Sequence, residues 1–202
     1  MTLSLSEKIT GFVLRPAETF RQVRSETFGD VATYFAVLLI INAVLSAFVG
    51  LLGFGSALGM PGAGIAGAGG VGGMIAALIL SVIAGIIGLV LGSILLHIGV
   101  LVMGGSGGFV STFKATVYAL TPYYLLGWIP VIGALAGIWG LIVEILGIRE
   151  LHDMDTGKAV IAWLISIVIV IVIALVLIVI LGLALFSLFG IASSTITPGI
   201  TP

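Results

Sequence analysis

Long uncharged stretches, separated by short polar segments, dominate the pattern of this chain. No Asp, Glu, Lys or Arg occurs over 31–113 or over 159–202, and Glu144 is the one charged residue between Lys114 and Arg149. A helix needs roughly 20 consecutive apolar residues to cross about 30 Å of hydrocarbon. The hydropathy pattern therefore predicts five membrane-spanning helices. They cover residues 31–53, 72–103, 112–128, 130–148 and 159–189.

The path of two of these segments stays open. Segment 112–128 is short and contains Pro122, so 112–148 forms either two full crossings or a re-entrant hairpin. Both versions return Arg149 to the same side of the membrane. Segment 159–189 would be about 46 Å long as one helix, so it either tilts or breaks near Gly182.

Composition supports a membrane protein. Only 7% of the 202 residues are charged, against about a quarter in a typical soluble domain, and 60% are hydrophobic. The net charge of −1 implies no nucleic-acid partner, and the absence of cysteine excludes disulfides and thiolate metal sites. The fold class expected is all-α, a polytopic transmembrane bundle of about five spans. Its parts are a short amphipathic cytoplasmic segment over 1–30, the transmembrane domain over 31–189 and an uncharged tail over 190–202.

The Lys and Arg residues indicate which side of the membrane the N-terminus occupies. With five spans, segment 1–30 and the loops over 104–114 and 149–158 fall on one side, and they hold four, one and two of the seven Lys and Arg residues. The positive-inside rule therefore places the N-terminus in the cytoplasm of a protein that lies in the cell membrane. We expect the N-terminus to be retained, because the first apolar run is too long for a signal peptide and lacks a processing site.

The first thirty residues have an amphipathic, helical pattern. Ser4 and Glu7 fit a capping box, and Pro16 suits the first turn of a second short helix. The apolar residues that share one face are Ile9, Phe12, Val13, Phe20 and Val23; the charged residues mostly off this face are Lys8, Arg15, Glu18 and Arg21. Such a segment lies among lipid headgroups, held by apolar burial and by attraction to anionic lipid, or packs on the inner end of the bundle. The pattern leaves both interpretations open.

Small residues form stripes along three of the spans. In lipid the hydrophobic effect does not drive helices together, so small residues that allow close backbone approach indicate the packing faces. The stripe in the first span consists of Asn42, Ser46, Gly50 and Gly53, the stripe in the second of Ser81, Gly85, Gly88, Gly92 and Gly99, and the stripe in the fourth of Gly133, Gly137, Gly140 and Gly147. The fifth span has Ala174 as its only small residue over 167–181. We therefore expect a core of spans one, two and four, with the third nearby and the fifth peripheral and exposed to lipid.

Four residues are candidates for binding chemistry. Glu144 lies on the glycine stripe of the fourth span, and an intramembrane carboxyl is costly and usually faces the protein interior. It is either a proton- or cation-linked site or a structural carboxyl that is protonated or paired with Arg149 or Lys114. His97 can hydrogen-bond a neighbouring helix. Lys114 and Tyr118 lie near the inner end of the third span, as part of a polar groove or of an aromatic belt with a proline kink.

No pattern typical of catalysis or of metal binding is present. Residues 104–108 match G-x-S-x-G, but the strand–turn–helix context that gives this motif its meaning is missing. Two histidines without cysteine predict no metal site, and the Gly-rich tract over 62–73 has no Lys and follows no strand, so it predicts no phosphate-binding loop. We expect no enzymatic activity, no catalytic residues and no cofactor.

Several short motifs, in order along the chain, resemble those of the Yip family. They are Pro16 with Thr19-Phe20, the Gly104–Gly108 turn followed by Phe109, Tyr118-Ala119-Leu120-Thr121-Pro122, Ile138-Trp139-Gly140-Leu141 continuing through Gly147-Ile148 to His152, and Lys158-Ala159. The resemblance covers residues 15–185. It implies a five-span membrane domain, whose eukaryotic members interact with Rab GTPases and act in vesicle transport.

The chain departs from the eukaryotic pattern before its first span. Eukaryotic members carry a long cytosolic region with an Asp-Leu-Tyr-Gly-Pro motif, whereas this chain has thirty residues there without the motif, so GTPase binding is not supported. The function expected is non-enzymatic: organising the membrane or binding membrane partners, which are the lipid bilayer, other membrane proteins or a second copy of the chain. The alternative is a small transporter or channel that uses Glu144, although the two halves show no evident inverted repeat.

Overall fold

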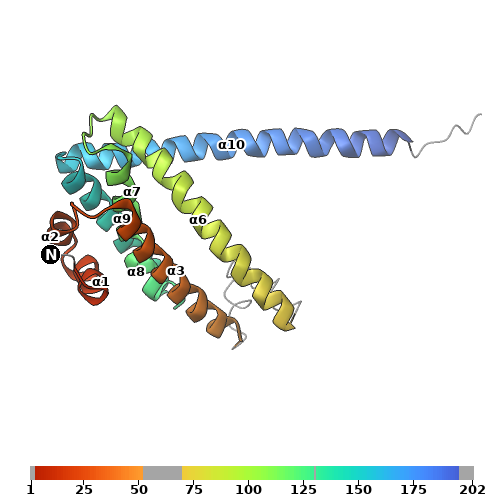
Figure 1. The fold of residues 1–202 in the computed structure, drawn as a ribbon. Coiled ribbons are helices and arrows are strands. Elements are labelled where there is room, and N and C mark those ends of the chain that lie inside the picture. Colours follow the sequence, from red (N-terminus) through yellow and green to blue (C-terminus); the bar gives the residue numbers. More distant parts are fainter. Residues whose placement is uncertain (1–2, 52–69, 130, 196–202) are drawn as a thin grey trace, which may run out of the picture.

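The computed structural model describes residues 3–51, 70–129 and 131–195, and the regular elements among them are all α-helices. In chain order they are α1 (Leu5–Leu14), α2 (Pro16–Gln22), α3 (Phe28–Leu51), α6 (Gly70–Val102), α7 (Gly108–Ala119), α8 (Thr121–Leu126), α9 (Ile132–Leu151) and α10 (Thr156–Thr195). Figure 1 shows α3, α6, α7, α8 and α9 packed as a bundle, with α1 and α2 at one end and α10 leaving it as a separate long helix. The all-α membrane bundle predicted from the hydropathy pattern is confirmed.

The short N-terminal helices begin where the sequence predicts. The Ser4 hydroxyl accepts a hydrogen bond from the Glu7 amide, and the Glu7 carboxylate accepts one from the Ser4 amide at 2.7 Å. The hydrogen bonds from Ser4 lower the pKa of Glu7. Pro16 opens α2 in its first turn, where the missing N–H costs nothing. Thr27 and Asp30 exchange the same pair of hydrogen bonds at the start of α3.

Among the residues that the structure describes, four helices are long and apolar enough to cross a membrane: α3, α6, α9 and α10. The segment predicted as the third span is instead two short helices, α7 and α8, joined at Leu120. Together they cover residues 108–126, which corresponds to about 28 Å of helical rise, and both pack against α9. The described part of the membrane domain therefore has about five helical segments, namely four long helices and the broken segment formed by α7 and α8.

The core centres on α7, whereas the glycine stripes predicted a core of spans one, two and four. Every residue from Thr112 to Ala119 is buried, and α7 packs against α3, α6 and α9. Tyr118 is fully buried, and Phe113 and Val117 belong to the same apolar core. The sequence placed this helix only near the core because it contains polar Thr, Lys and Tyr side chains. In the structure these side chains are shielded by protein and not by lipid.

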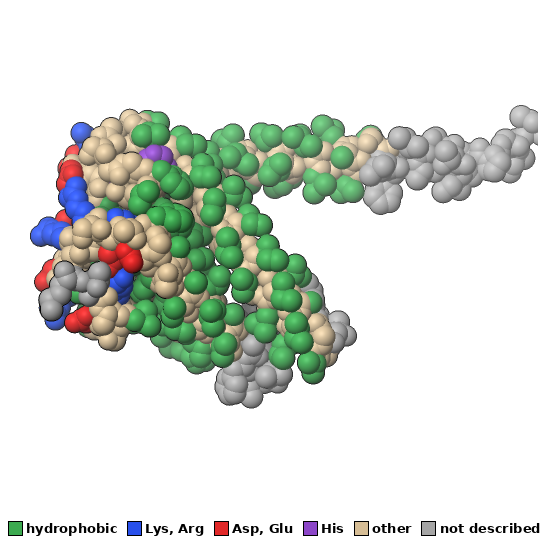
Figure 2. Space-filling view, viewed as in Figure 1, with side chains coloured by type: hydrophobic (Ala, Val, Ile, Leu, Met, Phe, Trp, Pro, Cys, Tyr) green, Lys and Arg blue, Asp and Glu red, His purple; other side chains and the backbone are tan. Residues whose placement is uncertain are grey.

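Only the first part of α10 packs against the bundle. Its buried residues are Ala159, Ala162 and Ser166, and this part of the helix contacts α6 and α9. Every residue over 171–187 is exposed, and Figure 2 shows apolar side chains along this length. The fifth span is thus peripheral over 171–187, as expected, whereas its beginning belongs to the core.

Glycine permits close approach at several positions of the stripes predicted in the second and fourth spans. A Cβ at Gly99 would collide with the Ala162 carbonyl oxygen, so α6 and α10 cross there with their backbones in contact. A Cβ at Gly140 would lie 2.8 Å from the Ala119 carbonyl oxygen, where α9 passes α7. At Gly133 the nearest atom, 2.6 Å away, is a carbonyl oxygen of the turn before α9. These positions need glycine because a backbone atom of a neighbouring segment takes the place of the side chain.

Other positions of the stripes meet no backbone atom of a neighbouring helix among the described residues. A Cβ at Gly85 would lie 3.1 Å from Leu39 Cδ1, which is a flexible side-chain contact. Gly88 and Gly92 have no described atom within 4 Å of such a Cβ, and Gly137 has only Tyr123 at 4.0 Å. The expected close packing at Gly88, Gly92 and Gly137 is therefore not found within the described part of the chain, because α6 diverges from α10 beyond their crossing (Figure 1) and α9 keeps an ordinary distance at Gly137.

Candidate functional site

A buried ion pair ties the N-terminal helices to the bundle. Lys8 Nζ lies 2.7 Å from Glu26 Oε1, and the two side chains are 9% and 4% exposed. The Tyr118 hydroxyl donates to Glu26 Oε2, and the Lys8 ammonium lies 5.6 Å from the ring centroid of Tyr34. Phe12 stacks on Tyr118 with 4.4 Å between ring centroids. We call these five residues the Glu26 cluster; each of its charges meets an opposite charge as well as an aromatic or hydroxyl neighbour.

The N-terminal helices pack on protein, which decides between the two interpretations of this segment. α1 contacts α8, and α2 contacts α9. Phe12, Phe20 and Val23 are fully buried in these contacts. The helical periodicity was wrong about Lys8, which lies on the buried face because Glu26 neutralises it there.

Surface ion pairs join α2 and the chain just after it to the C-terminal end of α9 and the chain just after that. Arg21 Nε lies 2.7 Å from a Glu150 oxygen, Arg149 Nη2 lies 2.5 Å from the other, and Arg24 pairs with Asp153. Hydrogen bonding between the two side chains raises the pKa of Arg24 and lowers the pKa of Asp153. Exposed pairs contribute little each. These ion pairs, α1, α2 and the C-terminal end of α9 form what we call the charged end of the molecule. The charged side chains gather there in Figure 2.

Lys114 and Tyr118, the two candidates near the inner end of the third span, take part in this packing. Lys114 is 5% exposed, and its Nζ donates to the Arg24 carbonyl oxygen at 2.8 Å. Tyr118 belongs to the Glu26 cluster. Neither side chain pairs with Glu144 in the described structure. The polar groove considered for the third span is therefore filled by α1 and by the chain before α3.

A second buried network joins the two histidines through Thr112. His97 Nδ1 lies 2.7 Å from Thr112 Oγ1, which lies 3.0 Å from His152 Nε2. The Gly107 amide donates to His152 Nδ1 at 3.1 Å, and Ser106 Oγ donates to the His152 carbonyl oxygen at 3.3 Å. The network thus links α6, α7, the loop before α7 and the C-terminal end of α9. His97 does hydrogen-bond a neighbouring helix, while Thr112 carried no signal in the sequence beyond its polarity.

The Gly107 amide fixes the direction of the hydrogen bonds in this network. A backbone amide can only donate, so His152 Nδ1 accepts and His152 Nε2 carries the hydrogen, which it donates to Thr112 Oγ1. The Thr112 hydroxyl then donates to His97 Nδ1. Burial, and next the proximity of His97, lowers the pKa of His152 to about 4, which keeps this ring neutral at physiological pH.

These contacts do not form a nucleophilic or metal-binding arrangement. Ser106 donates to a carbonyl oxygen and not to an imidazole nitrogen, so no base activates it. Both ring nitrogens of His152 are engaged with protein. Within the part of the chain that the structure describes, no three His, Cys, Asp or Glu side chains are grouped to hold a metal ion.

Glu144 points into the protein between three helices. Its Oε2 accepts a hydrogen bond from Trp163 Nε1 of α10 at 3.0 Å, and Thr116 of α7 is a second hydrogen-bonding neighbour. The two cations considered as its partners are engaged elsewhere, because Arg149 pairs with Glu150 and Lys114 bonds a carbonyl oxygen. The structure therefore places Glu144 as a contact of α9 with α10, and it is Trp163, which the sequence did not single out, that completes this contact.

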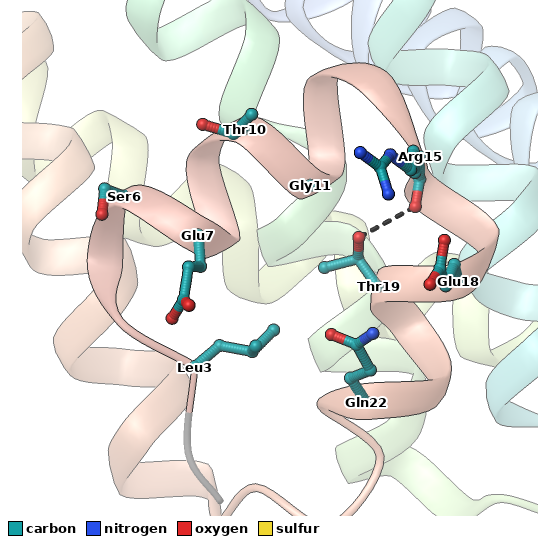
Figure 3. A pocket seen from close by; sticks show the side chains of 9 residues that line it. All are labelled: Leu3, Ser6, Glu7, Thr10, Gly11, Arg15, Glu18, Thr19 and Gln22. Carbon is teal, nitrogen blue, oxygen red and sulfur yellow. Dashed lines mark hydrogen bonds between the residues drawn. The ribbon is translucent and has the colours of Figure 1, made fainter.

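A groove of about 380 Å³ lies at the surface between α1 and α2 (Figure 3). The residues that line it are Leu3, Ser6, Glu7, Thr10, Gly11, Arg15, Glu18, Thr19 and Gln22. Within it Gly11 lies against the Thr19 side chain, whose hydroxyl donates to the Arg15 carbonyl oxygen at 2.8 Å. One basic and two acidic side chains give the groove mixed charge, which favours neither an anion nor a cation.

The helices that form these networks correspond to one known protein family. The Yip1 domain matches residues 10–178, from the middle of α1 into the exposed half of α10. The chain belongs to the Yip1 family. No curated protein and no solved structure matches it significantly. The resemblance to the Yip family that the sequence motifs indicated is therefore confirmed over most of the chain.

The motifs behind that resemblance meet one another in this Yip1 domain. A Cβ at Gly147 would lie 2.6 Å from Phe20 Cζ, so the glycine of the fourth-span motif makes room for the ring of the N-terminal motif. Gly107 of the Gly-rich turn donates to His152. Motif residues that are far apart in the sequence thus form the contacts at the charged end of the Yip1 domain.

Proposed function

We propose that this Yip1 protein organises the membrane or binds membrane partners without catalysis, from the cell membrane and with its N-terminus in the cytoplasm. The Yip1 domain and the long apolar helices support a membrane role. The buried polar side chains described above are engaged in hydrogen bonds between helices, which supports a structural use of these groups. Lipid, other membrane proteins and a second copy of the chain are the partners that this role implies.

The exposed apolar length of α10 carries the proposal. Val176, Leu177 and Ile178 are 50%, 59% and 66% exposed, and every residue over 171–187 is exposed, so the described part of the chain covers no side of this length. Ile86 and Ile87 of α6 are 47% and 52% exposed. Apolar surface of this extent is covered by lipid or by partner helices. The protein therefore offers contacts to the membrane that its own fold does not use.

The distribution of charge supports the orientation. Lys8, Arg21, Arg24 and Arg149 all lie at the charged end, and Figure 2 shows apolar side chains along the rest of the visible face. Excess Lys and Arg mark the cytoplasmic side of a membrane protein.

Site-specific photo-crosslinking in native membranes tests the partner-binding role. A photoreactive residue at Val176 should give discrete adducts with a protein or with a selected lipid, because this position faces away from the chain on a lone helix. A matched probe at Thr10, in the groove at the charged end, reports on contacts outside the membrane. Adducts at Val176 that contain only lipids, in the proportions of the bulk membrane, would speak against a partner or a lipid preference.

Single cysteines test the orientation, because the chain has no cysteine of its own. Ser25→Cys and Thr156→Cys should resist an impermeant thiol reagent in intact cells. Ala63→Cys, in the Gly-rich segment outside the described residues, should react. Reaction of Thr156→Cys from outside the cell would overturn the proposed topology.

The alternative function is a small transporter or channel that uses Glu144. Lys114 and Tyr118, the polar candidates near the inner end of the third span, bond to the N-terminal segment and not to Glu144, which supports the partner-binding role over this alternative.

A further inference from the structure

The buried network between the two histidines fixes where the hydrogen of the His97 ring lies. Thr112 Oγ1 accepts the hydrogen of His152 Nε2, so its own hydrogen goes to His97 Nδ1, its other neighbour, at 2.7 Å. Among the described residues the Thr112 hydroxyl has no other acceptor. An imidazole that accepts a hydrogen bond at Nδ1 carries its hydrogen at Nε2. His97 Nε2 is therefore an N–H donor.

This donor has no hydrogen-bond partner in the described part of the chain, where the ring of His97 bonds through Nδ1. The side-chain polar atoms that are buried there without a partner are Ser93 Oγ and Trp139 Nε1. Because His97 Nε2 is not one of these buried atoms, it reaches the surface. The Phe109 ring lies at a steep angle to the imidazole, with 5.6 Å between centroids, and an aromatic ring is only a weak acceptor. The N–H is thus open to an acceptor from outside the described chain.

The position of His97 on α6 corresponds to the level of the lipid headgroups. α6 has 33 residues and is about 50 Å long, which exceeds about 30 Å of hydrocarbon, so its last turns reach the headgroup layer. His97 lies five residues before the end of this helix, about 8 Å along it. Ile94 and Leu101, one turn before and one turn after His97 on the same face, are both exposed apolar residues. Figure 2 shows histidine atoms at the surface between the charged end and the apolar side chains.

We propose that His97 binds a phospholipid of the leaflet at the charged end, by donating a hydrogen bond from Nε2 to an ester or phosphate oxygen of the lipid. These oxygens are acceptors only, so they match an N–H group. Ile94 and Leu101 contact the acyl chains of the same lipid. The lipid thereby extends the network that joins α6, α7 and the end of α9. This site lies on α6 and goes beyond the proposed function, which rests on α10.

Solid-state NMR of the full-length protein in nanodiscs of dioleoylphosphatidylcholine tests the proposal directly. The chain has two histidines, so isotope-labelled histidine gives two rings, and the His97→Gln variant assigns them. Both rings should carry hydrogen at Nε2, but only the His97 hydrogen should contact lipid, at phosphorus if the phosphate accepts and at a labelled carbonyl carbon if the ester accepts. His152, which donates to Thr112, is the control in the same sample. A His97 ring with hydrogen at Nδ1, or an Nε2 hydrogen that contacts only water or protein, would overturn the proposal.

Titration of the same lipid into delipidated protein in detergent tests what the contact contributes, because the rise in melting temperature gives an apparent lipid affinity. His97→Leu, which lacks the donor, should bind about 2–10-fold more weakly, the range expected for one hydrogen bond. His97→Gln keeps an acceptor for Thr112 and a donor for lipid, so its affinity should be nearly unchanged. Thr112→Val lowers stability but keeps the imidazole, and it should also retain the affinity. Unchanged affinity in His97→Leu, or an equal loss in Thr112→Val, would contradict a lipid contact of His97.

Discussion

Two buried polar groups, Glu26 and His152, depend at the residue scale on hydrogen-bond partners from distant parts of the chain. Glu26 receives Lys8 from α1 and Tyr118 from α7. His152 receives the Gly107 amide from a loop 45 residues earlier. A buried polar group that loses its partner costs far more than the net value of the contact, so these sites are sensitive to single substitutions.

Removing Lys8 should destabilise the protein strongly. Lys8→Met leaves the Glu26 carboxylate buried without its counter-charge, and we expect a loss of about 3 kcal/mol or more in the free energy of unfolding. The double variant Lys8→Met/Glu26→Gln should recover much of this loss, because a neutral amide still accepts from Tyr118. Thermal unfolding in detergent measures both.

An exposed pair supplies the control for this experiment. Arg21 is 69% exposed in its pair with Glu150, so Arg21→Gln should cost about 1 kcal/mol or less. Equal losses for Lys8→Met and Arg21→Gln would show that the Glu26 cluster is not shielded from water.

His152 should make stability depend on pH. Its pKa is about 4 in the folded protein and about 6.5 in an unfolded chain, so between these values the unfolded state binds more protons. Stability from this group is therefore complete above about pH 6.5 and is lost as the pH falls towards 4. With allowance for partial solvent screening, the loss is on the order of 2 kcal/mol. Melting temperatures of the unmodified protein and of His152→Gln, compared at neutral and acidic pH, should differ in slope; parallel slopes would contradict this.

At the element scale, two pairs of helices meet where a glycine faces a backbone atom, namely α6 with α10 at Gly99 and α9 with α7 at Gly140. Gly99 and Gly88 lie on the same predicted stripe of α6, yet only Gly99 touches another helix among the described residues. Two glycines on one face of a helix therefore need not contact the same neighbouring helix, because α6 and α10 cross at a point and then separate (Figure 1).

Alanine substitutions at these two glycines should have opposite effects. Gly99→Ala drives a methyl group into the Ala162 carbonyl and should cost about 1–3 kcal/mol, since backbone cannot move aside as a side chain can. Gly88→Ala meets no described atom and should be neutral or slightly stabilising, as expected for alanine in place of glycine in a helix. Detergent-resistant folded protein after heating measures both. Equal losses would indicate that Gly88 packs against something outside the described chain.

The whole molecule consists of a compact charged end and long apolar helices that run from it. The break between α7 and α8 lies inside the bundle, and the turn before α9 is exposed, with Val131 77% exposed. If α7 and α8 together complete a crossing, this turn reaches the side opposite the charged end.

Labelling at Val131 should therefore separate a crossing from a re-entrant hairpin. In intact cells Val131→Cys should react with an impermeant thiol reagent as readily as Ala63→Cys, because about 28 Å of helix spans most of the hydrocarbon. Protection of Val131→Cys, with normal reaction of Ala63→Cys, would mean that the turn stays inside the membrane.

Features that depend on local pattern could be predicted from this sequence. The long apolar runs determined the class of fold, because hydrocarbon admits only segments that satisfy their own backbone hydrogen bonds. The Ser4–Glu7 capping box and Pro16 determined where α1 and α2 begin, because these interactions join residues within one helical turn. The order of short motifs was enough to identify the Yip1 family.

The tertiary structure alone decided which of these helices touch and which polar groups are shielded. The helical periodicity of the first thirty residues places Lys8 off the apolar face, whereas in the structure the ion pair with Glu26 allows Lys8 to be buried. In the sequence Thr112 is a polar residue in an otherwise apolar span. In the structure it is the centre of a hydrogen-bond network because His97 and His152 both reach it. In the sequence Glu144 suggests an ion pair with a nearby cation, whereas in the structure it accepts a hydrogen bond from the Trp163 indole of another helix. Such contacts depend on the crossing points of helices, which backbone approach at a few glycines sets and which no local pattern encodes.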